Sequence, residues 1–163
     1  MKYDVVFESE RIYFVKVCDK LVHDYLTMVN DEEVQKYISK NRNKYEVEQE
    51  KEWVRKKLLN NNFIFSMIEK ETNEFIGNIE IMDITNNSGE LGIAITSKKQ
   101  NNHFGQEAIK AMIEYAFDKF NINEIELNVY KFNPRGIHCY EKIGFIKDSE
   151  TEEEVHMIYK RNV

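Results

Sequence analysis

The feature that most constrains the fold of this chain is a long amphipathic helix pattern that lies between two strand patterns. From residue 104 to residue 120, apolar side chains recur at three- and four-residue steps, a spacing that places them on one face of a helix. Residues 90–96 (ELGIAIT) precede this pattern, and residues 124–130 (EIELNVY) follow it with apolar and polar residues in alternation. A strand, a helix and a strand in succession predict a crossover unit at the centre of an α+β domain.

The remaining patterns predict further strands and helices on either side of this unit. We expect a strand at 11–17, two short helices within 21–38, a third helix at 47–59, and strands at 63–69 and 75–84. Turn-forming residues separate the strands between 63 and 96, which predicts an antiparallel meander. Asn133 and Pro134 mark the start of a last helix and Gly144 its end, after which the tail offers one or two closing strands.

Length and composition narrow the class of protein. A chain of 163 residues suffices for one core and is short for two, so residues 1–163 are expected to form a single domain. A net charge of −6 opposes nucleic-acid binding, which depends on basic side chains that neutralise phosphates. No window approaches the roughly 20 apolar residues of a membrane span, and charges interrupt the N-terminal segment, so we expect a cytoplasmic protein with no membrane partner. Its cysteines and histidines follow no metal-binding spacing, and no metal is expected.

The most specific phrase in the chain is FNPRGIHCYEKIGF, residues 132–145. It resembles the N-x-x-A/G-x-x-x-Y-E-K-x-G-F segment of the GNAT superfamily, the acetyl-CoA-dependent N-acetyltransferases. The matching positions are Asn133, Gly136, Tyr140, Glu141, Lys142, Gly144 and Phe145. NDEEVQKYI, residues 30–38, resembles the segment after the first helix in the ribosomal-protein N-terminal (alanine/serine) acetyltransferase subfamily, and the resemblance covers nearly the whole chain.

This resemblance implies a fold and a cosubstrate. The fold would be α+β, with a mixed, mostly antiparallel sheet of six to seven strands, about five flanking helices and a central β-α-β crossover that binds acetyl-CoA. The family transfers the acetyl group directly from acetyl-CoA to an amine. No metal is needed for that transfer, so acetyl-CoA is the one cosubstrate expected.

The cofactor loop of the family reads R/Q-x-x-G-x-G/A, and residues 100–105 align with it. Gln100 and Gly105 match the first and last fixed positions, whereas His103 stands where glycine is usual and Asn101 where it is common in the subfamily. Glycine is favoured there because it accepts a positive φ and leaves no side chain between the backbone and the diphosphate. Asparagine and histidine tolerate left-handed backbone, so we expect the loop to keep its path and to bind acetyl-CoA more weakly.

The resemblance assigns cofactor binding to three segments. Backbone groups of residues 93–95 would pair with the pantetheine arm, and the first amides of the helix after the loop would hold the diphosphate. Asn133 would touch the cofactor, although a helix cap alone would also explain it. The residues expected to bind acetyl-CoA are Ile93, Ala94, Ile95, Gln100, Asn101, Asn102, His103, Phe104, Gly105, Gln106 and Asn133.

Acetyl transfer needs a neutral amine and a proton for the departing thiolate. Glu90 aligns with the acidic residue that precedes L-G in the family, and it is expected to act as the base through water, with Glu80 as the next candidate. Tyr140 is expected to donate a proton or hydrogen bond to the leaving sulfur, where positioning must compensate for a phenol pKa of about 10. Without the resemblance, Glu90 would be a polar strand-end residue and Tyr140 a packing residue.

Two functions follow from these residues. The first is an acetyl-CoA-dependent N-acetyltransferase whose acceptor is a primary amine, either a protein N-terminus or a small molecule such as a polyamine or an aminoglycoside antibiotic. The second is a catalytically weak acyl-CoA-binding or regulatory module. No segment matches a substrate signature, and both a monomer and a homodimer fit the sequence.

Overall fold

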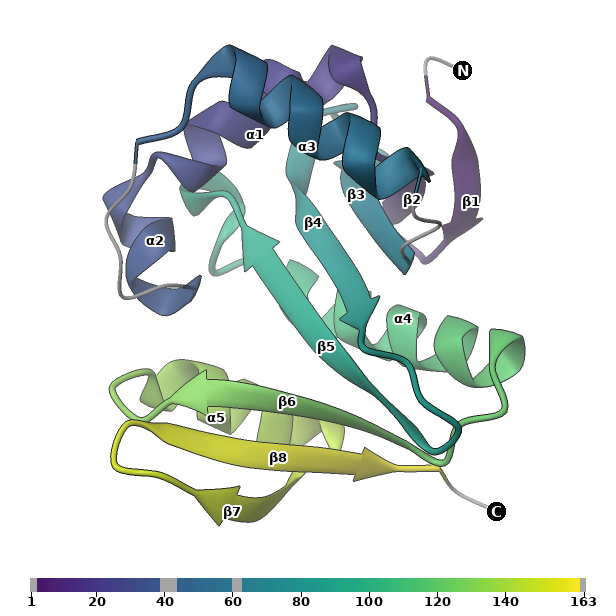
Figure 1. The fold of residues 1–163 in the computed structure, drawn as a ribbon, viewed down its shortest axis with the longest axis vertical. Coiled ribbons are helices and arrows are strands. Elements are labelled where there is room, and N and C mark those ends of the chain that lie inside the picture. The colour runs from purple at the N-terminus through teal and green to yellow at the C-terminus, as the bar shows by residue number, and fades with distance from the viewer. Residues whose placement is uncertain (1–2, 39–43, 60–62, 162–163) are drawn as a thin grey trace.

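The computed structural model of the protein describes residues 3–38, 44–59 and 63–161, and within them an eight-stranded sheet has the order β1-β2-β3-β4-β5-β6-β8-β7 (Figure 1). The strands are β1 (Val5–Glu8), β2 (Ile12–Lys16), β3 (Phe63–Glu69), β4 (Phe75–Met82), β5 (Ser88–Ile95), β6 (Glu124–Tyr130), β7 (Ile146–Glu150) and β8 (Glu154–Lys160). The α-helices are α1 (Val22–Val29), α2 (Glu32–Ile38), α3 (Val47–Leu59), α4 (Phe104–Lys119) and α5 (Pro134–Ile143), and two 3-10 turns are η1 (Asp19–Leu21) and η2 (Ser97–Lys99).

The predicted α+β class and its central crossover are confirmed. Strand β5, helix α4 and strand β6 follow one another, and β5 and β6 are parallel neighbours. Strands β3, β4 and β5 form the expected antiparallel meander. The sheet has more strands than the expected six to seven, because the tail supplies both β7 and β8 and the short strand β1 pairs with β2.

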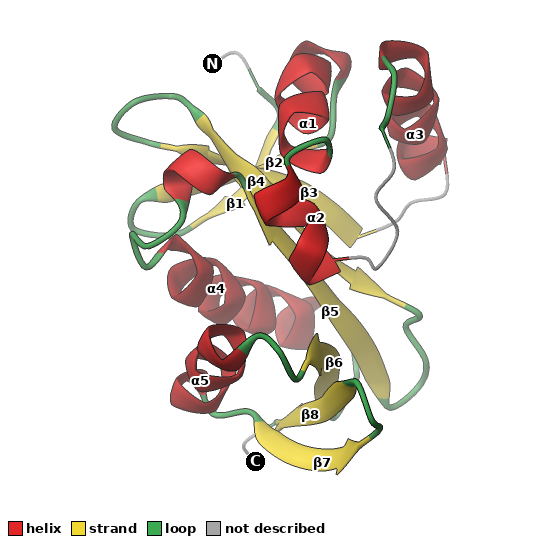
Figure 2. Ribbon diagram, turned by 90° about the vertical axis from the view of Figure 1, so that its left-hand side faces the viewer, coloured by secondary structure: helices red, strands yellow, loops and turns green. Residues whose placement is uncertain are grey.

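Side chains of the sheet alternate between two faces, and each face has its own helices. On one face, residues such as Phe65, Ile79 and Leu91 pack with Ile109 and Met112 of α4. We call this the α4 face. On the other face, the strand residues that alternate with these pack against α1, α2 and α3, through helix residues that include Tyr25, Val34 and Val54. Figure 2 shows α1 to α3 on one side of the sheet and α4 with α5 on the other, so any ligand at the sheet has two chemically different approaches.

Candidate active site

Strands β5 and β6 separate soon after they meet. They pair only where Ser88–Glu90 lies beside Glu124–Glu126, and beyond those residues the two strands diverge (Figure 1). Strand β5 stays paired with β4 as far as Ile95, and β6 stays paired with β8 as far as Tyr130. Within the described residues, the edge of β5 that faces β6 therefore has no strand partner from residue 91 onward. Its free N–H and C=O groups can pair with an extended ligand.

The unpaired edge includes the three strand residues expected to contact the cofactor, Ile93, Ala94 and Ile95. On the β4 side of this segment the backbones approach closely. A Cβ atom on Gly77, which lies opposite Ile95, would overlap the carbonyl oxygen of Ala94. Glycine at position 77 is therefore required for β5 to reach this position beside β4.

The loop after β5 contains the two left-handed residues that the sequence places at glycine positions. Asn101 has a φ of 66° and His103 a φ of 63°. Both positions thus have the left-handed backbone that asparagine and histidine were expected to tolerate. A left-handed backbone costs an L-residue about 1–2 kcal/mol, and asparagine is among the residues that adopt it most readily.

Two polar side chains of the loop hold its conformation. Asn102 Nδ2 donates to the carbonyl oxygens of Gln100 at 3.1 Å and Lys99 at 3.4 Å. Gln100 Nε2 donates to the carbonyl oxygen of Ile95 at 3.0 Å. The side chains of Gln100 and Asn102 therefore stabilise the loop itself.

Helix α4 begins directly after this loop with unpaired donors. The first N–H groups of a helix have no intrahelical acceptor, and the side chain of His103 at the N-cap position makes no capping hydrogen bond. A Cβ atom built on Gly105 would meet no heavy atom within 4 Å. The helix surface at Gly105 is thus open, and the helix dipole favours negative charge beside the amides of Phe104, Gly105 and Gln106. These residues fit the diphosphate of a coenzyme A group.

An ion pair that the sequence analysis missed supports the same loop. Arg11 donates to the Glu107 carboxylate through Nε and through its backbone N–H, both at 2.7 Å, and Ser9 Oγ donates at 2.6 Å. Burial alone would raise the pKa of Glu107, but these hydrogen bonds outweigh it and hold the pKa below its ordinary value. Arg11 also donates to the carbonyl oxygen of Asn102 at 3.1 Å, and its guanidinium lies 4.2 Å from the Phe104 ring centroid.

This pair neutralises a carboxylate in the first turn of α4, where an unpaired negative charge would repel a diphosphate. No local signal identifies the contact, because its partners are 96 residues apart. Arg11 was visible only as the first residue of a strand-like run.

Helix α5 supplies Asn133 and Tyr140. Asn133 caps the helix, since its Oδ1 accepts from the Gly136 N–H at 3.0 Å. The Tyr140 ring packs edge-on against Phe145, with ring centroids 5.9 Å apart. Burial raises the pKa of Tyr140 to about 12, with a smaller contribution from Cys139, so the phenol stays protonated near neutral pH. Burial raises the pKa of the Cys139 thiol, and the nearby Gln106 side chain opposes that rise.

The two candidate bases lie on the face opposite α4. Glu90, at the paired end of β5, accepts a hydrogen bond from Asn128 Nδ2 at 3.3 Å. Glu80 lies opposite Gly92 and pairs with Lys57 of α3 at 3.1 Å, with both side chains 21% exposed. Tyr140 packs with the core of the α4 face. The structure therefore places Tyr140 and the carboxylates on opposite sides of the sheet, and it places Glu90 at the closed end of the diverging strands.

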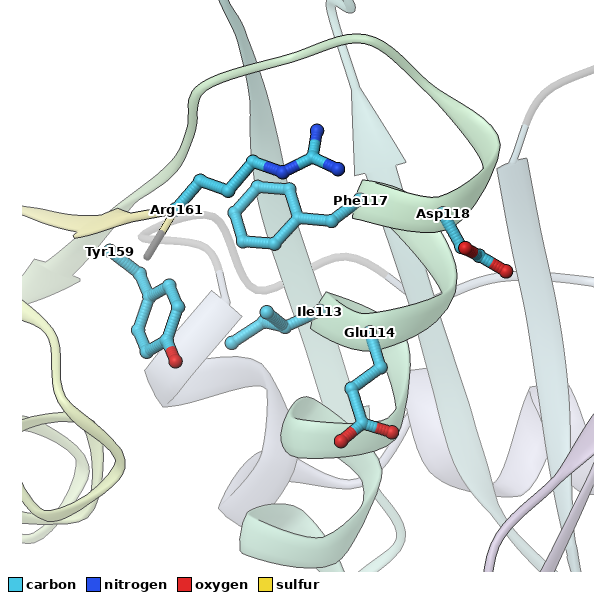
Figure 3. Close-up of a pocket in the computed structure, with 6 residues that line it drawn as sticks. All are labelled: Ile113, Glu114, Phe117, Asp118, Tyr159 and Arg161. Carbon is cyan, nitrogen blue, oxygen red and sulfur yellow. The ribbon is translucent and has the colours of Figure 1, made fainter. Parts of the chain in front are cut away.

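A separate hollow of about 290 Å³ lies between the later turns of α4 and the end of β8 (Figure 3). Figure 3 shows Ile113 and Phe117 of α4 facing Tyr159, with Arg161 above the Phe117 ring. Ile113 is nine residues after the first residue of α4, roughly 13 Å along the axis at 1.5 Å per residue. This hollow is therefore not part of the site at the helix N-terminus.

Two findings concern features that the described residues lack. None of the helices in 3–38, 44–59 and 63–161 is long and apolar enough to cross a bilayer. Over the same residues, histidine, cysteine and carboxylate side chains form no group of three that could hold a metal ion.

Comparisons with known proteins bear on the fold and the family. The spermidine N(1)-acetyltransferase of Vibrio cholerae serotype O1 is 30% identical over 90 residues, which are 54% of this chain and 52% of that protein. The chain thus matches about half the length of this curated relative. A crystal structure of spermidine N-acetyltransferase from Vibrio cholerae in complex with CoA and spermine superposes with a TM-score of 0.83 at 19% identity, covering 93% of this chain and 96% of that one.

The ribosomal-protein-S5-alanine acetyltransferase from Vibrio fischeri has a TM-score of 0.75 at 18% identity, covering 96% of this chain and 97% of that one. At these identities the two structural likenesses show the fold. The sequence model of the acetyltransferase (GNAT) domain matches residues 11–146. Since that match covers most of the sequence, the chain belongs to the GNAT acetyltransferase family.

Proposed function

We propose that this protein transfers an acetyl group directly from acetyl-CoA to a primary amine. One observation carries the proposal: β5 parts from β6 after Glu90, and its free edge leads within about ten residues to the unpaired amides of α4. An extended chain ending in a diphosphate matches that arrangement. Membership of the GNAT family supports the same reaction.

The cosubstrate would bind through backbone groups. The pantetheine arm would pair with the edge of β5 at Ile93, Ala94 and Ile95, and the diphosphate would accept hydrogen bonds from the first amides of α4. In this arrangement the loop residues Gln100 to His103 act by giving the backbone its path. Asn133, whose side-chain oxygen caps α5, would touch the cofactor with its remaining polar groups.

The acid and the base would act from opposite sides of the thioester. An amine with a pKa near 10 is almost entirely protonated at pH 7, so it must lose a proton before it attacks. Glu90 on the α1–α3 side would accept that proton through water, and Glu80 is the second candidate, although Lys57 occupies one of its oxygens. Tyr140 on the α4 side would give a hydrogen bond or proton to the departing sulfur.

The acceptor class is supported by the relatives. The matched proteins include a spermidine N(1)-acetyltransferase and a ribosomal-protein-S5-alanine acetyltransferase, so a polyamine and a protein N-terminus are both candidate acceptors. An overall charge of −6 favours a cationic amine in either case.

A thiol-release assay tests the function. The protein is mixed with acetyl-CoA and, in turn, a polyamine, an aminoglycoside and a peptide with a free N-terminus, and free thiol is measured. Amine-dependent release supports the proposal. Calorimetric binding of acetyl-CoA without release from any amine would contradict it and favour an acyl-CoA-binding module.

A further inference from the structure

Three aromatic side chains meet at the open end of the diverging strands. Tyr130 ends β6, Phe132 follows it in the turn to α5, and Tyr37 comes from α2. The rings of Tyr130 and Phe132 stack with centroids 5.0 Å apart at 12°, and those of Phe132 and Tyr37 lie 6.2 Å apart at 26°. We call Tyr37, Phe132 and Tyr130 the aromatic row.

The aromatic row connects the two sides of the site, which we call the β5 limb and the β6 limb after the strand to which each is attached. Helix α2 belongs to the β5 limb, because Ser97 Oγ, just after β5, donates to Asp31 Oδ2 at 2.6 Å. Phe132 belongs to the β6 limb, where the Lys131 N–H donates to the Glu153 carbonyl oxygen in the β7–β8 turn at 2.8 Å. Figure 1 shows α2 and the end of β6 facing each other at the same side of the molecule.

The row lies on the side from which the acceptor would come. Helix α2 packs through Val34 into the core of the α1–α3 face, whereas α4, which would hold the diphosphate, covers the opposite face. Although the rings contact each other, Tyr37 is 38% exposed and Phe132 is 58% exposed. Large apolar surface left exposed beside a site is a common mark of ligand contact.

Polar and acidic side chains continue from the row toward the proposed base. Glu126, Asn128 and Tyr130 alternate with the buried residues of β6 and so share one face. Asn128 donates to Glu90, and Glu126 lies 3.7 Å from Nε2 of His156. The carboxylates of Glu90 and Glu126 together with the aromatic row offer an alkylammonium chain both charge and apolar contact.

The row itself already shows one ammonium contact. Lys36 Nζ lies 5.0 Å from the centroid of the Tyr37 ring, within the range of a cation–π interaction. Within residues 3–38, 44–59 and 63–161, no lysine or arginine lies over the ring of Phe132. It is therefore the ring of the row most open to a cationic ligand.

We propose that the aromatic row positions the acceptor and favours amines carried on an unbranched alkyl chain with a second positive charge. The inference rests on the proposed acetyl transfer and deepens it. The methylene groups would lie on Phe132 and Tyr37, the second ammonium would be attracted by the rings and the carboxylates, and the reacting amine would point between β5 and β6.

The test compares Phe132→Ala and Tyr37→Ala with the control Ile146→Ala. Ile146 is 58% exposed, as Phe132 is, but it lies on the edge strand β7 away from the row. The acceptors are putrescine and a short peptide with an N-terminal alanine, and acetyl-CoA binding is measured by calorimetry. Both row variants should raise the KM for putrescine about three- to tenfold, with a smaller change for the peptide.

Acetyl-CoA affinity should stay within about twofold of wild type in all three variants, and Ile146→Ala should behave as wild type. Phe132→Trp, which keeps an aromatic ring at this position, should have the putrescine KM of the wild type. If both row variants are active and have an unchanged putrescine KM, the role of the aromatic row is overturned and the proposed acetyl transfer is not. Loss of acetyl-CoA affinity in step with the KM would also overturn the role of the row. Wild-type protein that releases no thiol with any amine would overturn the proposed function and the row together.

Discussion

Substitution of Gly105 separates cofactor binding from folding. Gly105 is the second residue of α4, and its φ is outside the left-handed region, so an L-residue fits the backbone there. A Cβ atom at this position meets no heavy atom within 4 Å. Alanine should therefore be accommodated by the folded protein, and the longer side chain of leucine would extend from the same open position into the space in which we place the diphosphate.

Replacement of Gly105 should raise the stability of the protein and lower its affinity for acetyl-CoA. Glycine in a helix costs about 0.5–1 kcal/mol relative to alanine, so Gly105→Ala should raise the midpoint of thermal unfolding by roughly 1–4 °C in a chain of this size. A hydrogen bond to a charged group is worth about 1.5–3 kcal/mol. If Gly105→Leu displaces the diphosphate from one amide, the Kd for acetyl-CoA should rise roughly 10- to 150-fold.

Calorimetric titration with acetyl-CoA and thermal unfolding of the same samples measure both effects. Glu114→Ala is the matched control, because Glu114 is exposed on a later turn of α4 and its replacement leaves the helix N-terminus unchanged. Weaker binding in a Gly105→Leu protein of normal stability supports the site. Wild-type affinity in that protein would refute the placement of the diphosphate.

Four further predictions concern the loop, the Arg11–Glu107 ion pair and the proposed acid. His103→Gly removes the side chain beside the first amides of α4 and should lower the Kd for acetyl-CoA, whereas weaker binding would show that the imidazole itself contributes. Because His103 is left-handed in the protein without ligand, the penalty of about 1 kcal/mol that glycine removes should appear as a gain in stability. Arg11→Met removes the guanidinium charge beside Glu107, which keeps its hydrogen bonds from Ser9 and from the backbone N–H of residue 11, and should raise the Kd for acetyl-CoA about tenfold, with recovery in the double variant that adds Glu107→Gln. An unchanged Kd in the single variant would contradict the role of the ion pair. Hydrogen bonds lower the pKa of Glu107, so its contribution to stability is present above the ordinary value of 4.5 and is lost as the pH falls through the lowered pKa. Glu107→Gln should therefore weaken the pH dependence of acid unfolding. Identical unfolding profiles for the two proteins would argue against this contribution. Tyr140→Phe should reduce kcat by about 10²–10⁴ with little change in acetyl-CoA affinity, and an unchanged kcat would remove Tyr140 from the reaction.

Elements with a strong local pattern were predictable to within a residue or two. Helix α3 at Val47–Leu59 and strand β3 at Phe63–Glu69 match their predicted bounds, because their apolar periodicity and flanking turn residues are local. Strand β1 was missed. Its four residues lie between charged side chains, and it forms by pairing with β2, which no local pattern reveals.

In the site, too, features that depend on local sequence could be predicted, and contacts between distant segments could not. The left-handed positions of the loop could be anticipated, since they depend on the identities of Asn101 and His103 and on their place before a helix. The Arg11–Glu107 pair and the Tyr37–Phe132 contact could not, because each joins segments that only the folded sheet brings together. Likewise, only the alternation of side chains in the assembled sheet puts Glu90 and Tyr140 on opposite faces.

The backbone amides at the start of α4 can be observed directly. In a ¹⁵N–¹H spectrum of the labelled protein, titration with coenzyme A should shift the amide protons of Phe104, Gly105 and Gln106 downfield, as expected for new hydrogen bonds to a charged acceptor. Pantetheine, which lacks the diphosphate, should leave these three signals near their starting positions. Coenzyme A that binds and shifts other signals while these three stay unchanged would contradict the account.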